Sequence, residues 1–256
     1  MTAKRTRAAS VGLFADQYVG LASVRYVLMY FREDVAYVVT TGDNEIAALC
    51  REHQCRVIYA DEISSTAAVG LLGDVDLLIL AWWPRILPKY MIDIPRRGVV
   101  NFHPSWLPYN RGKHYNFWTI VEDSPFGVSL HLVNEEIDQG AILFQAPIEK
   151  TWEDNGGSLY EAAKHTMVAL FEEHYEDLIT GNYVPRRQDL DAGSFHLARE
   201  LEPASEVFLD KSYQGRELLN LLRARTFAGK PSCYFHDGGK KYEVRISINE
   251  VKDGTD

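Results

Sequence analysis

Short apolar runs alternate with stretches of helical periodicity along the first part of the chain. The runs are rich in β-branched residues, and the stretches between them carry apolar residues at the spacing of one helix face. We predict strands over residues 9–15, 35–40, 56–60, 75–81 and 98–103. We predict helices over residues 18–31, 44–53 and 65–72. Alternating strands and helices are typical of βαβ units, so we expect an α/β fold with a Rossmann-like, largely parallel sheet and flanking helices.

Two further apolar runs, over residues 127–133 and 141–148, flank a polar loop that reads NEEIDQG. We predict a strand for each run. Ser158 and Glu161 have the spacing of a reciprocal capping box, which predicts a helix from Ser158 to Gly181. These elements extend the predicted α/β domain to residue 188.

The last part of the chain has a different character. A passage rich in Pro, Arg and Asp leads into a short predicted helix over residues 214–225. The segment CYFHDGGKKYEVRISI is predicted to form a β-hairpin with its turn at Asp237 and Gly238. We therefore expect a disordered tail over residues 1–8, one α/β domain over residues 9–188 and a small helix-and-hairpin appendage over residues 189–256.

The charge and the cysteines narrow the classes of partner and site. A net charge of -9 with only short basic runs argues against binding to nucleic acid, which needs clustered Lys and Arg. No apolar run has the length of a membrane-spanning helix. Cys50, Cys55 and Cys233 lack the spacing of zinc ligands, so we expect no metal and free thiols in a reducing cytoplasm.

The densest candidate chemistry lies in the segment GVVNFHPSWLPYNRG, at the end of a predicted buried strand. Asn101 and His103 are two residues apart on this strand, so their side chains point to the same side, at the edge where α/β sheets bind ligands. Asp138 stands on the loop NEEIDQG, where from spacing alone it could equally be a turn residue. An amide donor, an imidazole and a carboxylate together suit acyl transfer without a serine or cysteine nucleophile. His131 alternates with Leu130 and Leu132, which favours a supporting role for it.

These segments resemble the folate-dependent formyltransferase family, which includes glycinamide ribonucleotide transformylase, methionyl-tRNA formyltransferase and the sugar N-formyltransferases. Asn101, His103, Pro104 and Ser105 match the NxHPS motif of that family, and LPYNRG matches its LPxxRG extension. GVSLHLVNEEIDQG is similar to the segment GVTxHxxxxxxDxG, a match that implies Asp138 as the catalytic aspartate. AWWPRILP resembles the loop whose backbone wraps the pterin ring. That resemblance implies cofactor contacts from Trp83, Arg85, Ile86 and Leu87.

The resemblance implies transfer of a formyl group from 10-formyltetrahydrofolate to a primary amine, without a metal. Asn101 and His103 would donate hydrogen bonds to the formyl oxygen, and Asp138 would orient the imidazole. Either His103 or Asp138 could act as the base.

Among the members of this family, the chain most resembles the sugar N-formyltransferases. The stretch FADQYVG lacks the paired glycines that would cradle the phosphate of glycinamide ribonucleotide, and the charge disfavours transfer RNA. We expect a nucleotide-linked amino sugar as the acceptor, used for a surface polysaccharide such as O-antigen. Tyr109, Arg111 and Lys113 are the predicted substrate-binding residues. Further candidates for stacking on the base are Tyr115, Phe117, Trp118 and Tyr234.

The appendage predicts a homodimer. Its helix carries Leu218, Leu219, Leu221 and Leu222, which so short a helix cannot bury alone, and an isolated hairpin is marginally stable. The alternatives to the sugar acceptor are methionyl-tRNA, glycinamide ribonucleotide, or water, the last making the protein a formyl-folate hydrolase. A folate-binding protein without turnover is a further alternative.

Overall fold

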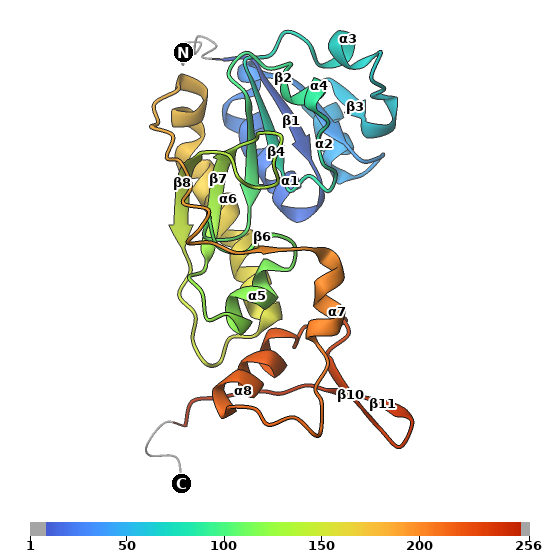
Figure 1. Ribbon diagram of the computed structural model, residues 1–256. Helices are drawn as coiled ribbons and strands as arrows, with labels where there is room; N and C mark the ends of the chain where they lie inside the picture. The colour runs from blue at the N-terminus through green and yellow to red at the C-terminus, as the bar shows by residue number, and fades with distance from the viewer. Residues whose placement is uncertain (1–8, 252–256) are drawn as a thin grey trace. The chain divides into compact units, whose positions relative to one another are not determined.

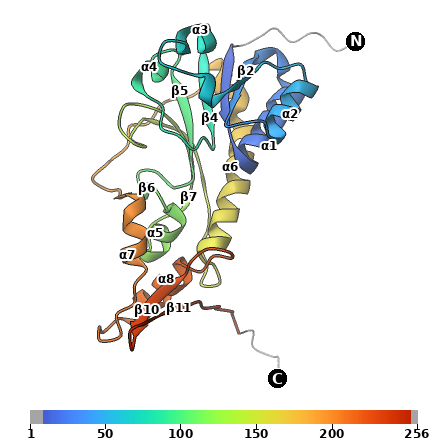
Figure 2. The same ribbon diagram turned by 90° about the vertical axis from the view of Figure 1, so that its right-hand side faces the viewer.

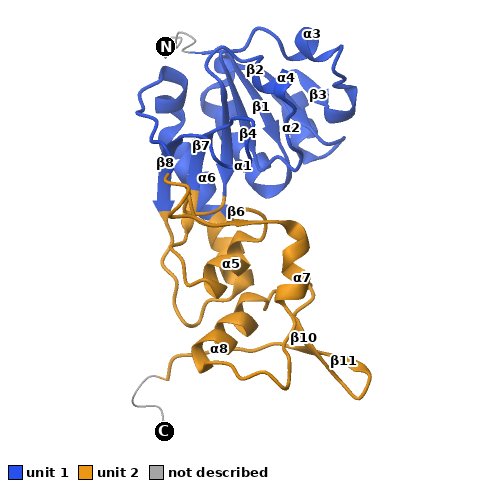
Figure 3. Cartoon of the chain, viewed as in Figure 1, with its two compact units in different colours: residues 1–103, 129–146, 164–188 blue, residues 104–128, 147–163, 189–256 orange. Residues whose placement is uncertain are grey.

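The computed structural model describes residues 9–251, which form two compact units (Figure 3). Unit 1 comprises residues 9–103, 129–146 and 164–188. Unit 2 comprises residues 104–128, 147–163 and 189–251. The predicted tail over residues 1–8 lies outside the described residues. The predicted boundary at residue 188 separates a catalytic domain from an appendage along the sequence. The two units instead group residues that lie close in space, so the predicted boundary stays a prediction.

A seven-stranded sheet in the order β3-β2-β1-β4-β5-β7-β8 forms the framework of unit 1 (Figure 1). Its strands are β1 (Val11–Ala15), β2 (Val35–Thr40), β3 (Val57–Tyr59), β4 (Leu77–Ala81), β5 (Val99–His103), β7 (Gly127–Leu132) and β8 (Ile142–Pro147). The pairs among β1 to β5 are parallel, and β7 runs antiparallel to β5. The predicted Rossmann-like, largely parallel sheet is therefore confirmed, and each of these seven strands lies within a predicted one.

Helices cover both faces of this sheet, with α1 and α2 on one side of the strands and α3 and α4 on the other (Figure 2). The helices are α1 (Gln17–Tyr30), α2 (Glu45–Glu52), α3 (Ala68–Leu72), α4 (Lys89–Ile92) and α6 (Gly156–Thr180), with single 3-10 turns η1 (Arg32–Asp34) and η2 (Ala60–Glu62). Because both faces are covered, β1 and β4 are buried at every residue. Phe14, Tyr37, Leu72 and Leu78 belong to the resulting apolar core.

The start of α6 differs from the prediction. The helix begins at Gly156, and the side-chain Oδ1 of Asn155 accepts hydrogen bonds from the backbone N–H groups of Gly157 (2.9 Å) and Ser158 (3.0 Å). Asn155 is therefore the N-cap, and the predicted capping box at Ser158 is wrong. The hydroxyl of Ser158 instead donates to Asp154 Oδ1 at 2.8 Å.

The end of α2 is a Schellman motif. Gln54 adopts a left-handed conformation with φ 51°, and its N–H donates to the carbonyl of Arg51 (3.1 Å). The N–H of Cys55 donates to the carbonyl of Cys50 (2.8 Å), which completes the motif. The two residues whose side chains meet in such a motif are here both cysteines.

Unit 2 has less regular structure. It contains α5 (Tyr115–Val121), η3 (Ala198–Glu200), α7 (Leu201–Ala204), α8 (Gly215–Ala224), the antiparallel hairpin of β10 (Cys233–Asp237) and β11 (Lys240–Val244), and the short parallel pair β6 (Arg111–Gly112) and β9 (Phe195–His196). The predicted helix and hairpin are confirmed. The turn consists of Gly238 and Gly239, both with positive φ, so it lies one residue beyond the predicted position.

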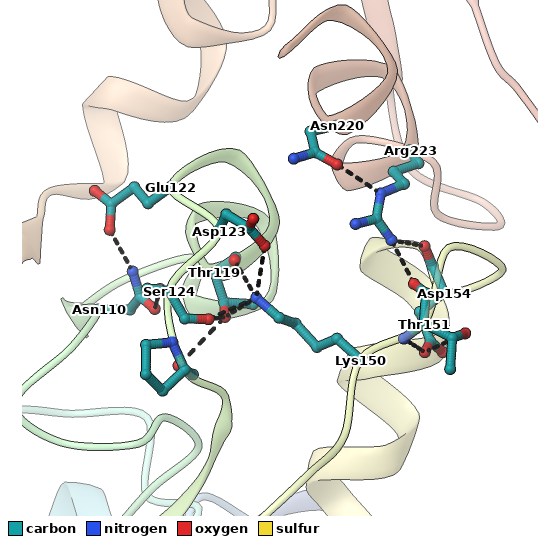
Figure 4. Close-up of polar contacts among 11 residues, drawn as sticks. Asn110, Thr119, Glu122, Asp123, Ser124, Lys150, Thr151, Asp154, Asn220 and Arg223 are labelled. Carbon is teal, nitrogen blue, oxygen red and sulfur yellow. Dashed lines mark hydrogen bonds and ion pairs between the residues drawn. The ribbon is translucent and has the colours of Figure 1, made fainter. Parts of the chain in front are cut away.

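Two cationic side chains hold irregular segments of unit 2 together (Figure 4). Lys150 Nζ donates to the carbonyl oxygens of Thr119 (2.7 Å) and Ser124 (2.5 Å). Arg223 Nη1 donates to the carbonyl oxygens of Thr151 (2.7 Å) and Asp154 (2.9 Å). Burial lowers the pKa of Lys150 and of Arg223, because removal from water disfavours a charged side chain. The hydrogen bonds to the carbonyl oxygens offset part of this cost.

Candidate active site

The carboxyl end of β5 presents two polar side chains of the predicted site. Asn101 is half-buried, and His103 is only 4% exposed. The antiparallel register places Asn101 opposite His131 on β7 and His103 opposite Ser129. Directly opposite residues of paired strands have neighbouring side chains, so this register brings a second histidine to Asn101.

The loop between β7 and β8 delivers the carboxylate. Asp138 has φ 54°, a left-handed conformation that Asp tolerates better than most residues. Gly140 is required there, because a Cβ atom at this position would lie 1.7 Å from the carbonyl oxygen of Leu132. With the loop in this shape, Asp138 Oδ2 lies 3.3 Å from His103 Nδ1, and Asp138 Oδ1 lies 3.5 Å from His131 Nε2.

His131 links the amide and the carboxylate. Its Nε2 lies 3.2 Å from Asn101 Nδ2, and its Nδ1 lies 2.8 Å from the carbonyl oxygen of Leu132. A carbonyl oxygen only accepts, so Nδ1 carries a hydrogen and donates. When His131 is neutral, its Nε2 accepts from the Asn101 amide; when it is protonated, Nε2 can donate to Asp138. His131 therefore lies within reach of both Asn101 and Asp138. Its supporting role stays a prediction.

This arrangement suits stabilisation of a developing oxyanion. Asp138 contacts His103 through Nδ1, which leaves Nε2 on the opposite side of the imidazole ring. Asn101 and His103 supply donors from one strand, and the Asp138 carboxylate beside the imidazole can fix the orientation of its ring. Donors that are held in place in a partly buried site lower the energy of an oxyanion without reorganising during the reaction.

The residues predicted to bind the cofactor follow β4 in unit 1. The ring of Trp83 packs edge-on against Phe14, with centroids 5.1 Å apart, and its Nε1 is buried without a hydrogen-bond partner in the described part of the chain. Leu87 is buried in the core cluster. A contact from Leu87 to a pterin ring would therefore come from its backbone.

The two residues between them are exposed. Arg85 Nη1 lies 3.0 Å from Asp61 Oδ1 in a surface ion pair, and Ile86 is 80% exposed. This loop therefore lies at the surface and follows β4, which neighbours the strand of Asn101 in the same sheet. Cofactor contacts from these residues stay a prediction.

The residues predicted to bind the substrate lie in unit 2, on the segment that follows His103. Arg111 is 8% exposed, and its backbone N–H donates to the carbonyl of Ser194 (3.0 Å). The N–H of Lys113 donates to the carbonyl of His196 (3.0 Å), and the Lys113 side chain is exposed. The half-buried Tyr109 accepts at its carbonyl from the Ser105 hydroxyl (2.7 Å). The strand pair β6–β9 therefore fixes the backbone of this segment within unit 2.

Three of the aromatic residues proposed to stack on a base, Tyr115, Phe117 and Tyr234, are buried in unit 2. Tyr115 stacks at 6.4 Å against Phe126 and at 6.4 Å against Tyr160, and its burial raises its pKa well above the ordinary value. Phe117 is 2% exposed. Their burial disfavours stacking on a base, which stays a prediction for these residues. The apolar face of α5 was not assigned to a core, because the helix was not predicted.

Sequence reasoning did not single out Gln188 as a site residue. Its side-chain Nε2 donates to the backbone carbonyls of Asp138 (2.9 Å) and Gly140 (2.6 Å). No local pattern could have indicated this contact, because about fifty residues separate the partners along the chain.

Within residues 9–251, no group of three or more His, Cys, Asp or Glu side chains is placed to hold a metal ion. None of the helices in this part of the chain combines the length and apolar character needed to cross a membrane.

Comparison with known proteins gave two family matches. Residues 42–173 match the family described as formyl transferase. Residues 200–250 match the family described as N-formyltransferase dimerization C-terminal domain.

Individual proteins of two acceptor classes are similar to the chain. A dTDP-4-amino-4,6-dideoxyglucose formyltransferase from Mycobacterium tuberculosis is 28% identical over 179 residues, which cover 69% of this chain and 75% of the relative. A methionyl-tRNA formyltransferase from Fusobacterium nucleatum is 32% identical over 70% of this chain and 58% of its own length.

Solved structures share the fold over most of its length. A sugar N-formyltransferase from a Shewanella species has a TM-score of 0.77 and 25% identity, and the match covers 95% of this chain and 99% of the other. An N-formyltransferase from Helicobacter canadensis, solved with folinic acid and dTDP-3-aminofucose, has a TM-score of 0.74 and 18% identity over 91% of this chain and 85% of the other.

Proposed function

The chain belongs to the formyl transferase family, and we propose that it transfers a formyl group from 10-formyltetrahydrofolate to the primary amine of a nucleotide-linked amino sugar. The observation that carries this proposal is the contact between the Asp138 carboxylate and His103, which lies on the same strand as Asn101. The three groups match the needs of formyl transfer between two nitrogens.

The reaction begins with attack of the amine nitrogen on the formyl carbon, which moves negative charge onto the formyl oxygen. The Asn101 amide and the protonated imidazole of His103 donate to that oxygen. The bond from the formyl carbon to N10 of the folate then breaks, N10 takes up a proton, and the amine loses one. Asp138 holds the imidazole and accepts the amine proton directly or through a water.

Several observations favour a sugar nucleotide as the acceptor. The relative from Mycobacterium tuberculosis is named for a dTDP-linked amino sugar, and the Helicobacter canadensis protein was solved with another. The net charge of -9 disfavours a transfer RNA, although a methionyl-tRNA formyltransferase is also among the relatives. Arg111 and Lys113 are our candidates for the diphosphate, and Tyr109 for the base. Such a product would serve surface polysaccharide or O-antigen synthesis, with the enzyme in the cytoplasm.

The folate contacts belong to the same proposal. Trp83 would line the pterin pocket, and the backbone of Arg85, Ile86 and Leu87 would meet the ring. The 80% exposure of Ile86 supports this placement, because the backbone of the loop lies at the surface there. Trp83 Nε1 is buried and has no hydrogen-bond partner among the described residues.

A homodimer through the C-terminal part of unit 2 completes the proposal. The match of residues 200–250 to a dimerization domain supports it. Leu219 (42%), Phe208 (54%) and Leu209 (57%) are exposed, and the residues that α8 buries are Asn220, Arg223 and Ala224 rather than its leucines. Sedimentation at micromolar concentration should give the mass of a dimer, and a monomer would contradict this part.

The decisive experiment measures tetrahydrofolate release from 10-formyltetrahydrofolate with a panel of acceptors. The panel contains dTDP-, GDP- and UDP-linked amino sugars beside unformylated methionyl-tRNA and glycinamide ribonucleotide. We expect turnover with one of the sugars. Preference for either of the other two acceptors would contradict the assignment, and formate release without any amine would indicate the hydrolase.

Variants test the residues. Asn101→Ala and His103→Ala should each lower kcat about a hundredfold or more, because each removes a donor to the oxyanion. The matched control is His236→Ala, which removes an exposed histidine of the hairpin and should leave kcat unchanged. Near-normal rates for both site variants would exclude the proposed constellation.

A further inference from the structure

Gln188 lies beside the aspartate loop because of a local pairing of the chain. Ile142 at the start of β8 and Arg186 exchange two backbone hydrogen bonds, each of 2.8 Å. Two residues further on, Gln188 is 6% exposed, whereas its neighbours Arg187 and Asp189 are exposed. The pairing therefore directs one glutamine side chain into the interior of unit 1.

The amide of Gln188 acts only as a donor. Nε2 reaches the carbonyl oxygens of Asp138 (2.9 Å) and Gly140 (2.6 Å), and Oε1 is buried without a hydrogen-bond partner among the described residues. The reverse orientation of the amide would set Oε1 against two groups that can only accept, so the contacts fix the orientation. A buried unpartnered acceptor is costly, which indicates that the two donated bonds matter.

The aspartate loop needs an external support. Asp138 holds a left-handed φ of 54°, a conformation that residues other than glycine rarely adopt. Gly140 is packed against the carbonyl of Leu132, so the loop has little room to compensate. Fixing the carbonyls of Asp138 and Gly140 fixes the peptide plane that follows each of these residues. The first of these planes restricts ψ of Asp138 and thereby the direction of its side chain.

We propose that Gln188 is a positioning residue for formyl transfer: it holds Asp138 against His103 and His131 by binding two backbone carbonyls of the loop. This inference rests on the proposed function, since Asp138 matters to turnover only if the three-residue constellation is the catalytic one. Gln188 itself does not take part in the proton or formyl transfers.

Gln188→Met tests the role with little change in side-chain volume. We expect kcat to fall about 10- to 100-fold, as for other residues that orient a reacting group, while KM for the folate changes less than twofold. Gln188→Glu should reduce kcat at least as much, because it faces two carbonyls with a carboxylate. Arg187→Met, the exposed neighbour, is the control and should retain full activity. A kcat unchanged in both Gln188 variants overturns the proposal.

A double-mutant cycle separates positioning from a general loss of structure. If Gln188 acts through Asp138, then Gln188→Met should lower kcat less than threefold further in the background of Asp138→Asn. If Gln188→Met acted through a general loss of structure, its decrease in kcat would multiply with that of Asp138→Asn. Such full multiplication of the two decreases would overturn the proposal.

Hydrogen exchange tests the support without any substrate. Backbone amides of residues 134–141 should exchange at least tenfold faster in Gln188→Met than in Arg187→Met, while those of β1 and β4 stay unchanged. Unchanged exchange in the loop overturns the proposal even if the enzyme is active. Faster exchange in a protein that formylates no acceptor would confirm the support and reject the proposed function instead.

Discussion

In unit 1, apolar side chains bury the central strands β1 and β4 along their whole length, whereas the interior of unit 2 contains the charged groups of Lys150, Arg111 and Arg223. The difference follows from the backbone. A sheet satisfies its own N–H and C=O groups, so its surroundings can be purely apolar. The irregular segments of unit 2 leave carbonyls unpaired, and long cationic side chains bind them (Figure 4). Apolar truncation should therefore harm unit 1 most, and loss of a polar group should harm unit 2 most.

The largest effect is expected in the sheet of unit 1. Leu78→Ala on β4, where the side chain is fully buried, should lower the free energy of unfolding by about 3 to 4 kcal/mol through lost burial and a cavity. Chemical unfolding followed by circular dichroism measures it, with the 70% exposed Val69→Ala as control. A loss below about 1 kcal/mol would contradict the claim that apolar burial is what stabilises the sheet of unit 1.

Lys150→Met tests the other side. The variant keeps most of the apolar stem but removes the ammonium that donates to the carbonyls of Thr119 and Ser124, of which, among the described residues, only the Ser124 carbonyl keeps another donor, the Thr119 hydroxyl. We therefore expect a loss of about 2 kcal/mol. Lys230→Met, at an exposed lysine of the same unit, should cost less than about 0.5 kcal/mol. If both variants unfolded alike, the ammonium would not be what holds this region together.

The smallest effect is expected where unit 1 is itself irregular. Just before β1, the backbone N–H of Ser10 donates to Asp76 Oδ2 (2.8 Å), and Arg96 Nη1 lies 3.0 Å from Asp76 Oδ1. The Ser10 N–H first and Arg96 second lower the pKa of Asp76. Asp76→Asn should cost about 1 kcal/mol at neutral pH.

The pH dependence of that effect has a defined sign. A carboxyl whose pKa is lowered in the folded state contributes stability above its unfolded pKa of about 3.9, and loses it as pH falls through the lowered value. Wild type and Asp76→Asn should therefore converge in acid unfolding experiments, while Asp74→Asn, at a 91% exposed side chain, should follow wild type throughout. A pH-independent difference would assign the effect to packing.

The sequence predicted those parts of the fold that leave a periodic pattern. The run VDLLIL indicated β4 because a strand covered on both faces needs apolar residues throughout. The capping box at Ser158 was wrong because the helix already begins at Gly156, where Asn155 caps it by accepting from the N–H groups of Gly157 and Ser158. The helix α5 was missed because seven residues give too short a pattern to separate from the preceding loop.

The site shows the same limit. Asn101 and His103 could be placed together because one strand carries both, and the family resemblance added Asp138. The contact of Gln188 with the aspartate loop could not be predicted, because it depends on how a chain segment after α6 returns to β8. Contacts set by tertiary packing leave no trace in local spacing.

The buried thiols allow the opening of each unit to be measured separately. Cys50 and Cys55, brought together where α2 ends, are buried in unit 1, and Cys233 is buried in unit 2. A hydrogen bond to Cys55 and burial raise the pKa of Cys50, and burial raises the pKa of Cys233 to about 12. Neither of these two thiols forms a reactive thiolate readily while its surroundings stay folded. An alkylating reagent should therefore label Cys50 at a rate set by the opening of unit 1, and Cys233 at a rate set by the opening of unit 2. Both rates can be measured in one sample without an introduced probe.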